Sequence, residues 1–507
     1  MNSVTFGGTV TVDDIVNIAR GCAGAAFSEE FEARVNRCRA HVDRFGREEK
    51  AIYGLTTGLG DNWKKFIPEE GRTIIQRNHI YAHTCAVGEP IPEECVRAMM
   101  AVMLAHFGSG HTGIRLETLC LIRDMLNAGV TPRVPGHGSV GYLTLEGHIG
   151  MVMIGQGWAW YQGELLDGGE ALRRSGLKPV TLSSKEGLTL LSGTTSVTAF
   201  GALAMYDAKT LCLTADISGS FSLEVLKGTL MAMDARIMNV RPHPDQINTA
   251  CNIRAILKDS PILARFQGHR VQDALSIRCM PQLHGAVKKA VKDGLETMDI
   301  ELNSSVDNPL IFEEGEDAIA LMGCNADGSY VGLASDALTI AITDLCKMSN
   351  SRIDRMLNHL VSELPAFLNK NADYNNGLMM IQYAAAGLQG ELRILAHPAV
   401  VDNLTTCANQ EDYISMGYNA AKKAYDAMHL AKYILAAELI CDGQALHCMD
   451  GADCGEATGA VCRLLREQVP EMDADSPLSP YLEAVAAQII DRRYIQAVER
   501  KTGELRF

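Results

Sequence analysis

Histidines and cysteines with spacings that suggest metal binding occur at two places in the chain. His79 and His83 are four residues apart, which puts both side chains on one face of a helix. No acidic residue stands between them, and no third ligand is evident. Three cysteines and a histidine cluster within residues 441–454, but their spacing is not that of a zinc site. We therefore expect no bound metal, and we interpret the second cluster as buried or surface thiols.

Two glycine-rich segments, Gly108–Gly113 and Gly136–Gly141, match the G-x-G-x-x-G pattern of dinucleotide-binding loops. A true fingerprint follows a strand and opens a helix at its last glycine. Pro132 and Pro135 precede the second match and disfavour a strand there. The first match follows the helical pattern Ala98–Leu104. We expect both segments to be tight loops, and we expect no nucleotide or other organic cofactor.

Helical periodicity dominates the elements that must position any chemistry. Glu30–Phe45 and Leu482–Arg500 have the spacing of amphipathic helices, and apolar residues from Ile342 to Leu360 recur on one helical face. Residues 195–230 and 415–440 are rich in Ala, Leu and Met, which is typical of buried bundle helices. Strand-like alternation is short and scarce. The pattern predicts a mainly α-helical protein with a long helical bundle.

A change in composition predicts how the chain is divided. Glycines and loops are frequent up to the loop at 182–187, and long helices dominate after about residue 200. We predict an N-terminal region, 1–200, that is loop-rich and bears the active site, and a central and C-terminal helical bundle, 201–507. A chain of 507 residues is long enough to bury a large core.

Composition excludes several classes of function. The net charge of −15 argues against a nucleic-acid-binding protein, which usually has a basic stripe. We see no uninterrupted apolar run that predicts a membrane span, and residues 1–6 lack the basic and apolar regions of a signal peptide. The fifteen cysteines are odd in number and scattered through apolar segments, which favours reduced thiols. We therefore expect a cytoplasmic protein that binds neither nucleic acid nor a membrane.

Several segments spread over most of the chain carry recognisable motifs in a fixed order. They are Tyr53–Gly60, Gln76–His83, Pro135–Gly141, Val271–Gln282, Asn303–Leu310 and Ala408–Asp412. In order and spacing they resemble the histidine and phenylalanine ammonia-lyases. One such segment alone would be weak, but together they identify the chain as a member of that family. The resemblance implies the family's long helical bundle and a homotetramer whose active sites are each built from several subunits.

The resemblance breaks where the family carries its electrophile. In the family, an Ala-Ser-Gly triad after the segment that here ends at Gly141 cyclises into a methylidene-imidazolone. Here Tyr142 follows Gly141 directly, and His148 arrives three residues early. Ser192 and Leu275 stand where the family has an Asn and a Tyr that support the electrophile. These departures predict a lyase that works without the electrophile and without any other cofactor.

The resemblance also implies roles for individual residues. Tyr53 corresponds to the catalytic Tyr and would remove the β-proton, with its pKa depressed by His83 or Lys64. Arg278 would bind the substrate carboxylate, and Glu411 would face an imidazole N–H. The structural alternatives stay open: Tyr53 could anchor its loop, His83 and Arg278 could have purely structural partners, Glu411 could cap a helix, and Lys64 could be a solvated surface charge.

The lack of an electrophile suggests a substrate. A quaternary trimethylammonium has no lone pair for an electrophile to capture, and it departs as neutral trimethylamine. Tyr142, Glu146 or Trp63 could face such a cation, with Ser192 and Gln272 as further substrate contacts. This combination resembles the ergothionases, which release trimethylamine from ergothioneine and form thiourocanate. We therefore expect a carbon–nitrogen lyase that acts on an imidazole-containing betaine.

Two alternatives remain open. The chain could be a histidine ammonia-lyase whose modified triad is missing from the sequence as compiled. It could also be a binding homologue without catalytic activity. The joint retention of Tyr53, Arg278 and Glu411 argues against the second alternative.

Overall fold

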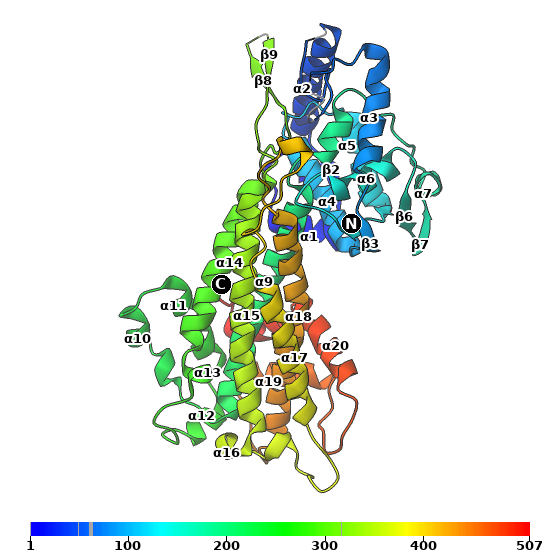
Figure 1. Cartoon of the computed structure of the whole chain (residues 1–507). Helices are drawn as coiled ribbons and strands as arrows, with labels where there is room; N and C mark the ends of the chain where they lie inside the picture. Colours follow the sequence, from blue (N-terminus) through cyan, green and yellow to red (C-terminus); the bar gives the residue numbers. More distant parts are fainter. Residues whose placement is uncertain (1, 49, 60–63, 316) are drawn as a thin grey trace. The chain divides into compact units, whose positions relative to one another are not determined.

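The computed structural model describes residues 2–48, 50–59, 64–315 and 317–507, and Figure 1 shows their helices and strands. The chain divides into two compact units, each made of separated stretches of sequence. The first unit comprises Met1–Tyr206, Leu295–Ser335 and Pro398–Lys422; the second comprises Asp207–Gly294, Asp336–His397 and Lys423–Phe507. The first unit thus contains the whole predicted N-terminal region, whose independence as a domain stays a prediction.

The first unit combines helices of moderate length with short strands. Its helices are α1 (Val12–Ala19), α2 (Glu29–Arg47), α3 (Glu69–His83), α4 (Glu93–Phe107), α5 (Leu116–Ala128), α6 (Thr144–Met153), α7 (Gly168–Arg174), α8 (Glu186–Leu191) and the 3₁₀ turn η4 (Cys407–Asn409). Its strands are β1 (Asn2–Phe6), β2 (Ala23–Phe27), β3 (Val87–Pro90), β4 (Thr131–Pro132), β5 (Pro135–His137), β6 (Trp158–Tyr161), β7 (Glu164–Asp167), β8 (Leu310–Glu314) and β9 (Asp317–Leu321). β1 and β2 pair in parallel, whereas β3–β5, β4–β6–β7 and β8–β9 are antiparallel.

The second unit is almost entirely helical. Its own elements are η2 (Leu230–Met233), α10 (Ala235–Asn239), α11 (Pro244–Ile256), α12 (Pro261–Arg265), α13 (Leu275–Arg278), α16 (His359–Ser362), η3 (Ala366–Leu368), α17 (Met379–Leu395), α19 (Glu456–Arg466), α20 (Ser479–Ile490) and α21 (Arg493–Thr502). Four long helices begin in one unit and end in the other: α9 (Thr195–Val225), α14 (Met280–Leu302), α15 (Ser329–Leu357) and α18 (Gly417–His447).

Buried polar networks link the long helices within the second unit. Arg352 of α15 donates to Glu438 of α18 at 3.1 Å, and Ser222 of α9 donates to the same carboxylate at 3.0 Å. His284 of α14 contacts Asp216 of α9, with 2.9 Å between Nδ1 and Oδ1. All five side chains are fully buried. Because a buried charge without a partner is costly, these pairs favour one register of the helices over others.

The mainly α-helical fold that the sequence predicts is confirmed. The predicted helix Glu30–Phe45 corresponds to α2, where Ser28 caps the first turn by accepting the backbone N–H of Phe31 at 3.2 Å. The prediction of one helix over Leu482–Arg500 is wrong, because Arg492 adopts a left-handed conformation (φ 58°) that ends α20 and starts α21. Leu360 also lies outside α15, which ends at Leu357.

One stretch of the chain contradicts the expectation that no segment is apolar enough to span a membrane. Among the described residues, the stretch Glu186–Val225 is long and apolar enough by composition to cross a bilayer, and the sequence analysis did not identify it. The apolar window of this stretch is completely buried inside the protein. Burial of this kind is typical of a core helix, and α9 makes up most of the stretch.

Candidate active site

A cavity of about 1030 Å³ lies in the first unit and gathers residues that are far apart in the sequence. Predicted site residues that line it are Tyr53, Lys64, His83, Tyr142, Ser192 and Glu411. They come from the loop before α3, the end of α3, the segment before α6, the end of α8 and the loop around η4. The fold of this unit therefore brings together a phenol, an amine, an imidazole and a carboxylate around one space.

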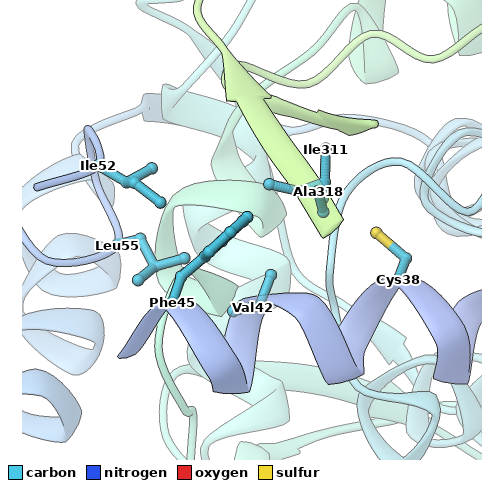
Figure 2. Packing of buried hydrophobic residues seen from close by; sticks show 7 residues of the cluster. All are labelled: Cys38, Val42, Phe45, Ile52, Leu55, Ile311 and Ala318. Atoms are coloured by element: carbon cyan, nitrogen blue, oxygen red, sulfur yellow. The ribbon is translucent and has the colours of Figure 1, made fainter. Parts of the chain in front are cut away.

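A hydrophobic cluster anchors the loop that carries Tyr53. Ile52 and Leu55, on either side of Tyr53, pack with residues of α2 and of the β8–β9 hairpin, as Figure 2 shows. The other members of the cluster are Cys38, Val42, Phe45, Ile311 and Ala318. Because Ile52 and Leu55 are almost fully buried, the backbone between them has little freedom, and Tyr53 is held at the cavity wall.

Hydrogen bonds close the same loop. The backbone N–H of Ile52 donates to Thr56 Oγ1 at 2.9 Å, and the N–H of Ile67 donates to the Thr56 carbonyl at 2.8 Å. Thr57 and Phe66 form an isolated antiparallel bridge. These contacts hold the segment with Lys64 beside the segment with Tyr53.

The imidazole of His83 stands at the C-terminal end of α3. Its Nδ1 lies 2.7 Å from the carbonyl oxygen of His79, and a carbonyl only accepts, so Nδ1 carries the proton of this bond. In the neutral ring, Nε2 is then the acceptor that is left for the cavity. Burial, helped by the neighbouring His83, lowers the pKa of His79 to about 4, so His79 stays neutral near pH 7.

Two glycines allow other helices to approach α3 closely. A Cβ on Gly187 of α8 would lie 2.4 Å from the carbonyl oxygen of Gln76, and a Cβ on Gly147 of α6 would lie 3.0 Å from that of His83. The N–H of Gly187 also donates to Gln76 Oε1 at 2.9 Å. Only residues without a side chain fit here, so the position of His83 relative to α6 and α8 is set by backbone contact.

Buried ion pairs fix α8, whose end carries Ser192. Glu186 accepts from Arg115 Nε at 3.0 Å and from Thr118 Oγ1 at 2.6 Å. Lys185 pairs with Asp307, and both side chains are fully buried. Asp307 precedes Asn308, another lining residue, so the same pair holds the approach to the β8–β9 hairpin at the cavity.

Tyr142 and Glu411 meet at one wall of the cavity. The Glu411 carboxylate accepts from Thr406 Oγ1 at 2.7 Å and is also hydrogen-bonded by the Tyr142 phenol. Burial, followed by the charge of Glu411, raises the pKa of Tyr142 well above its ordinary value. The charge of Asp327 also raises the pKa of the Tyr142 phenol. Burial is the main cause of a raised pKa of the Cys324 thiol, and the charge of Asp327 is the next. This wall is therefore acidic.

Three of the predicted site residues lie elsewhere. Glu146 is fully buried and does not line the cavity; one of its oxygens accepts the N–H of Ser196 at 3.1 Å, and the other has no partner among the described residues. Burial raises its pKa to about 7. Gln272 and Arg278 line a cavity of about 310 Å³ in the second unit. Trp63 lies outside the described residues.

Sequence reasoning missed the contribution of residues 322–327. Asp327 and Cys324 line the cavity, and Asp327 Oδ1 also accepts the N–H of Ser329 at 3.0 Å in the first turn of α15. The only signal in the sequence was the preceding motif Asn303–Leu310, which ends where the hairpin begins. Nothing in the loop itself indicates that the fold places it at the same cavity as Tyr142.

The described residues give no indication of a metal centre. No group of three or more His, Cys, Asp or Glu side chains among them is arranged to hold an ion. All fifteen cysteines are free thiols. His447, from the predicted thiol cluster, instead contacts Asp473 at 2.8 Å and Glu471 at 3.2 Å.

The residues around Gly141 do not fit the family's electrophile. The N–H of Gly141 donates to Ser139 Oγ at 3.2 Å, and the N–H of Leu143 donates to the carbonyl of Leu191 at 3.1 Å. The segment is thus already closed onto α8, with Tyr142 at the cavity wall. No Ala-Ser-Gly sequence is present from which the ring could form.

Comparison with known proteins places the chain among amino acid lyases. The sequence profile of the family described as aromatic amino acid lyase matches residues 10–467. Histidine ammonia-lyase from Caldanaerobacter subterraneus subsp. tengcongensis is 40% identical over 504 residues, covering 99% of this chain and 98% of that protein. The crystal structure of histidine ammonia-lyase from Trypanosoma cruzi is 33% identical with a TM-score of 0.93, covering 99% and 96%. Ergothionase from Treponema denticola, crystallised with desmethyl-ergothioneine sulfonic acid, is 27% identical with a TM-score of 0.90, covering 97% and 100%.

These comparisons overturn the expectation of a trimethylamine-releasing lyase. Curated relatives at about 40% identity over nearly the full length are named histidine ammonia-lyase, whereas the ergothionase structure is 27% identical. The expectation was wrong because it inferred a substrate from an absent group. A missing electrophile constrains how an amine leaves, but it does not identify the molecule that carries the amine.

Proposed function

The chain belongs to the aromatic amino acid lyase family, and we propose that it eliminates ammonia from histidine, breaking a carbon–nitrogen bond. The observation that carries this proposal is the 40% identity to a histidine ammonia-lyase over 504 residues. The cavity supports it, because Tyr53, His83 and Glu411 line one space large enough for a small amino acid.

In the proposed reaction, Tyr53 reacts as the phenolate and accepts the β-proton of the substrate, which returns it to the phenol. The electron pair of the broken Cβ–H bond forms the double bond, and the pair of the Cα–N bond leaves with the nitrogen as neutral ammonia. The products are urocanate and ammonia. Glu411 would accept the imidazole N–H, because Thr406 already holds one of its oxygens and fixes its direction. His83 and Lys64 line the same space and would orient the substrate or the phenol of Tyr53.

A carboxylate-binding group is still needed. No arginine lines the cavity among the described residues, and Arg278 lies in the second unit with its Nε buried and unpartnered there. A homotetramer in which a second copy supplies Arg278 would complete the site. Light scattering that shows a monomer with full activity would contradict this part of the proposal.

The mass of the purified protein distinguishes two versions of the proposal. A chain with the printed sequence has a mass of 54.9 kDa. If the natural chain contains the triad and has cyclised it, the measured mass exceeds this value by three residues less two waters. A measured mass of 54.9 kDa would mean that elimination proceeds with the side chains described above, without the electrophile.

Incubation with L-histidine tests the reaction itself. We expect release of ammonia together with the ultraviolet absorption of urocanate, in equal amounts. Histidine that binds but is not converted at high protein concentration would favour the binding homologue. Absence of both binding and conversion would remove the proposal.

A further inference from the structure

The cavity wall beside Gly141 carries electron-rich and negatively charged groups where an electrophilic lyase carries its electrophile. The groups there are the phenol of Tyr142, which is hydrogen-bonded to Glu411, and the carboxylate of Asp327. The Asp327 carboxylate is close enough for its charge to raise the pKa of that phenol. All three side chains line the same cavity. The position that would take up the amine covalently in an electrophile-bearing lyase therefore presents an aromatic ring and negative charge.

The two carboxylates differ in how far the protein already uses their oxygens. Asp327 uses Oδ1 to accept the N–H of Ser329 at 3.0 Å, and Glu411 uses Oε2 to accept from Thr406 at 2.7 Å. Asp327 thus keeps an oxygen with acceptor capacity at the cavity, whereas Glu411 is already engaged by Thr406 and by the Tyr142 phenol.

The amine of an amino acid must be neutral to attack an electrophile, since attack uses its lone pair. An amine that is not captured keeps its proton near neutral pH. It then requires a counter-charge, and a carboxylate gives it a charge-assisted hydrogen bond. A ring face adds attraction for the same cation.

We propose that Asp327 and the ring of Tyr142 hold the substrate's amine as an ammonium ion, without a covalent bond. This inference rests on the proposed elimination of ammonia and names the residues that select for an amine at that site. Asp327 neither gains nor loses a proton in this role. Its function is to hold the nitrogen so that the Cα–N bond stays aligned while Tyr53 accepts the β-proton.

Binding of two ligands that differ only in the amine tests the proposal. L-histidine and imidazolepropionate share the imidazole, the carbon chain and the carboxylate, but imidazolepropionate lacks the amine. In a Tyr53→Phe background, which binds histidine with little turnover, calorimetry should give a Kd for histidine at least about tenfold lower than for imidazolepropionate. When Asp327→Asn is added to this background, the ratio should fall about tenfold, a change equal to about 1.4 kcal/mol. The asparagine oxygen still accepts the N–H of Ser329, so the variant removes the charge and keeps the turn.

Variants of Tyr142 separate the ring from the hydroxyl. Tyr142→Phe keeps the ring face and should retain most of the preference for histidine, whereas Tyr142→Leu should lose several-fold of it. Asp317→Asn is the matched control, because Asp317 starts β9, which leads into the same loop, yet does not line the cavity. It should leave the ratio unchanged.

The outcomes separate this inference from the proposed function. If Asp327→Asn keeps the full preference for the amine, or if the Tyr53→Phe protein binds both ligands equally or not at all, the inference is overturned. Release of ammonia and urocanate by the unmodified protein reports on the proposed function alone. An enzyme that turns over histidine while Asp327→Asn leaves the ratio intact would refute the inference and keep the function.

Discussion

The two units use ionisable groups in opposite ways. In the second unit, Glu438 is fully buried and receives hydrogen bonds from Arg352 and Ser349 of α15 and from Ser218 of α9. In the first unit, Glu411 and Asp327 are partly exposed at a cavity of about 1030 Å³, and Asp327 has only one oxygen engaged by the protein. A closed network of this kind specifies how helices fit together, whereas an open one keeps capacity for a ligand.

This difference predicts that substitutions in the two regions affect different properties. Changes at the cavity should alter binding and turnover with little loss of stability. Changes in the closed networks should lower the free energy of unfolding before they affect chemistry. Variants with similar effects on both properties would show that the distinction is wrong.

The largest effect is expected from Tyr53→Phe at the cavity. General acid–base groups typically contribute about 10²- to 10⁴-fold to rate, so ammonia release from histidine should fall by about 10³-fold. The ring of the variant still packs, and the neighbouring Ile52 and Leu55 keep the loop in place. Thermal unfolding should therefore occur within about 2 °C of the unmodified protein. Retention of most of the activity would exclude Tyr53 as the base.

Arg352→Met in the closed network should have the opposite profile. Removing one partner of a buried pair leaves Glu438 uncompensated and should cost about 3–5 kcal/mol of unfolding free energy. Arg236→Met is the control, because Arg236 is exposed and pairs with Asp234 at the surface. Denaturant unfolding of both variants measures the difference. A loss below about 1 kcal/mol for Arg352→Met would mean that water or a rearrangement replaces the pair.

Glu146 combines features of both regions, since it is fully buried but has an oxygen without a partner among the described residues. Burial raises its pKa from 4.5 to about 7, so the folded state holds this proton more tightly than the unfolded state. The resulting stability is fully present below pH 4.5 and is lost as the pH rises through about 7. The loss is on the order of 3 kcal/mol. Glu146→Gln should remove this pH dependence, which unfolding curves between pH 5 and 8 would reveal; an unchanged slope would contradict the assignment to Glu146.

The smallest effect is expected at the surface of the β8–β9 hairpin. Asp317 pairs with Arg44 of α2 at 2.6 Å, but the Asp317 side chain is 80% exposed. Exposed pairs contribute about 0–1 kcal/mol, so Asp317→Asn should change the unfolding free energy by less than about 1 kcal/mol and leave turnover unchanged. A larger effect would show that the hairpin transmits strain to the cavity.

The sequence predicted the residues that belong to motifs and missed those that only the fold brings together. Tyr53, His83 and Glu411 were found because each lies in a segment with a recognisable pattern, and all three line the cavity. Asp327 has no such pattern around it; it reaches the cavity because the β8–β9 hairpin turns the chain back. No local rule connects position 327 with position 142.

The two wrong predictions, of one C-terminal helix and of the substrate, each have an identifiable cause in the sequence. Periodicity predicted one helix over Leu482–Arg500 because the apolar spacing continues past Arg492, and spacing does not detect a single left-handed residue. The substrate was predicted wrongly because the three-residue gap at Gly141 was given more weight than the similarity of the remaining chain. The long helices were predicted well because their apolar patterns extend over many turns.

Each of the four long helices α9, α14, α15 and α18 passes from one unit into the other without a break. Neither unit therefore corresponds to a single stretch of gene. A truncation that keeps the cavity-bearing unit intact would have to cut through helices, so this architecture leaves no place where recombination could exchange the catalytic part as a cassette.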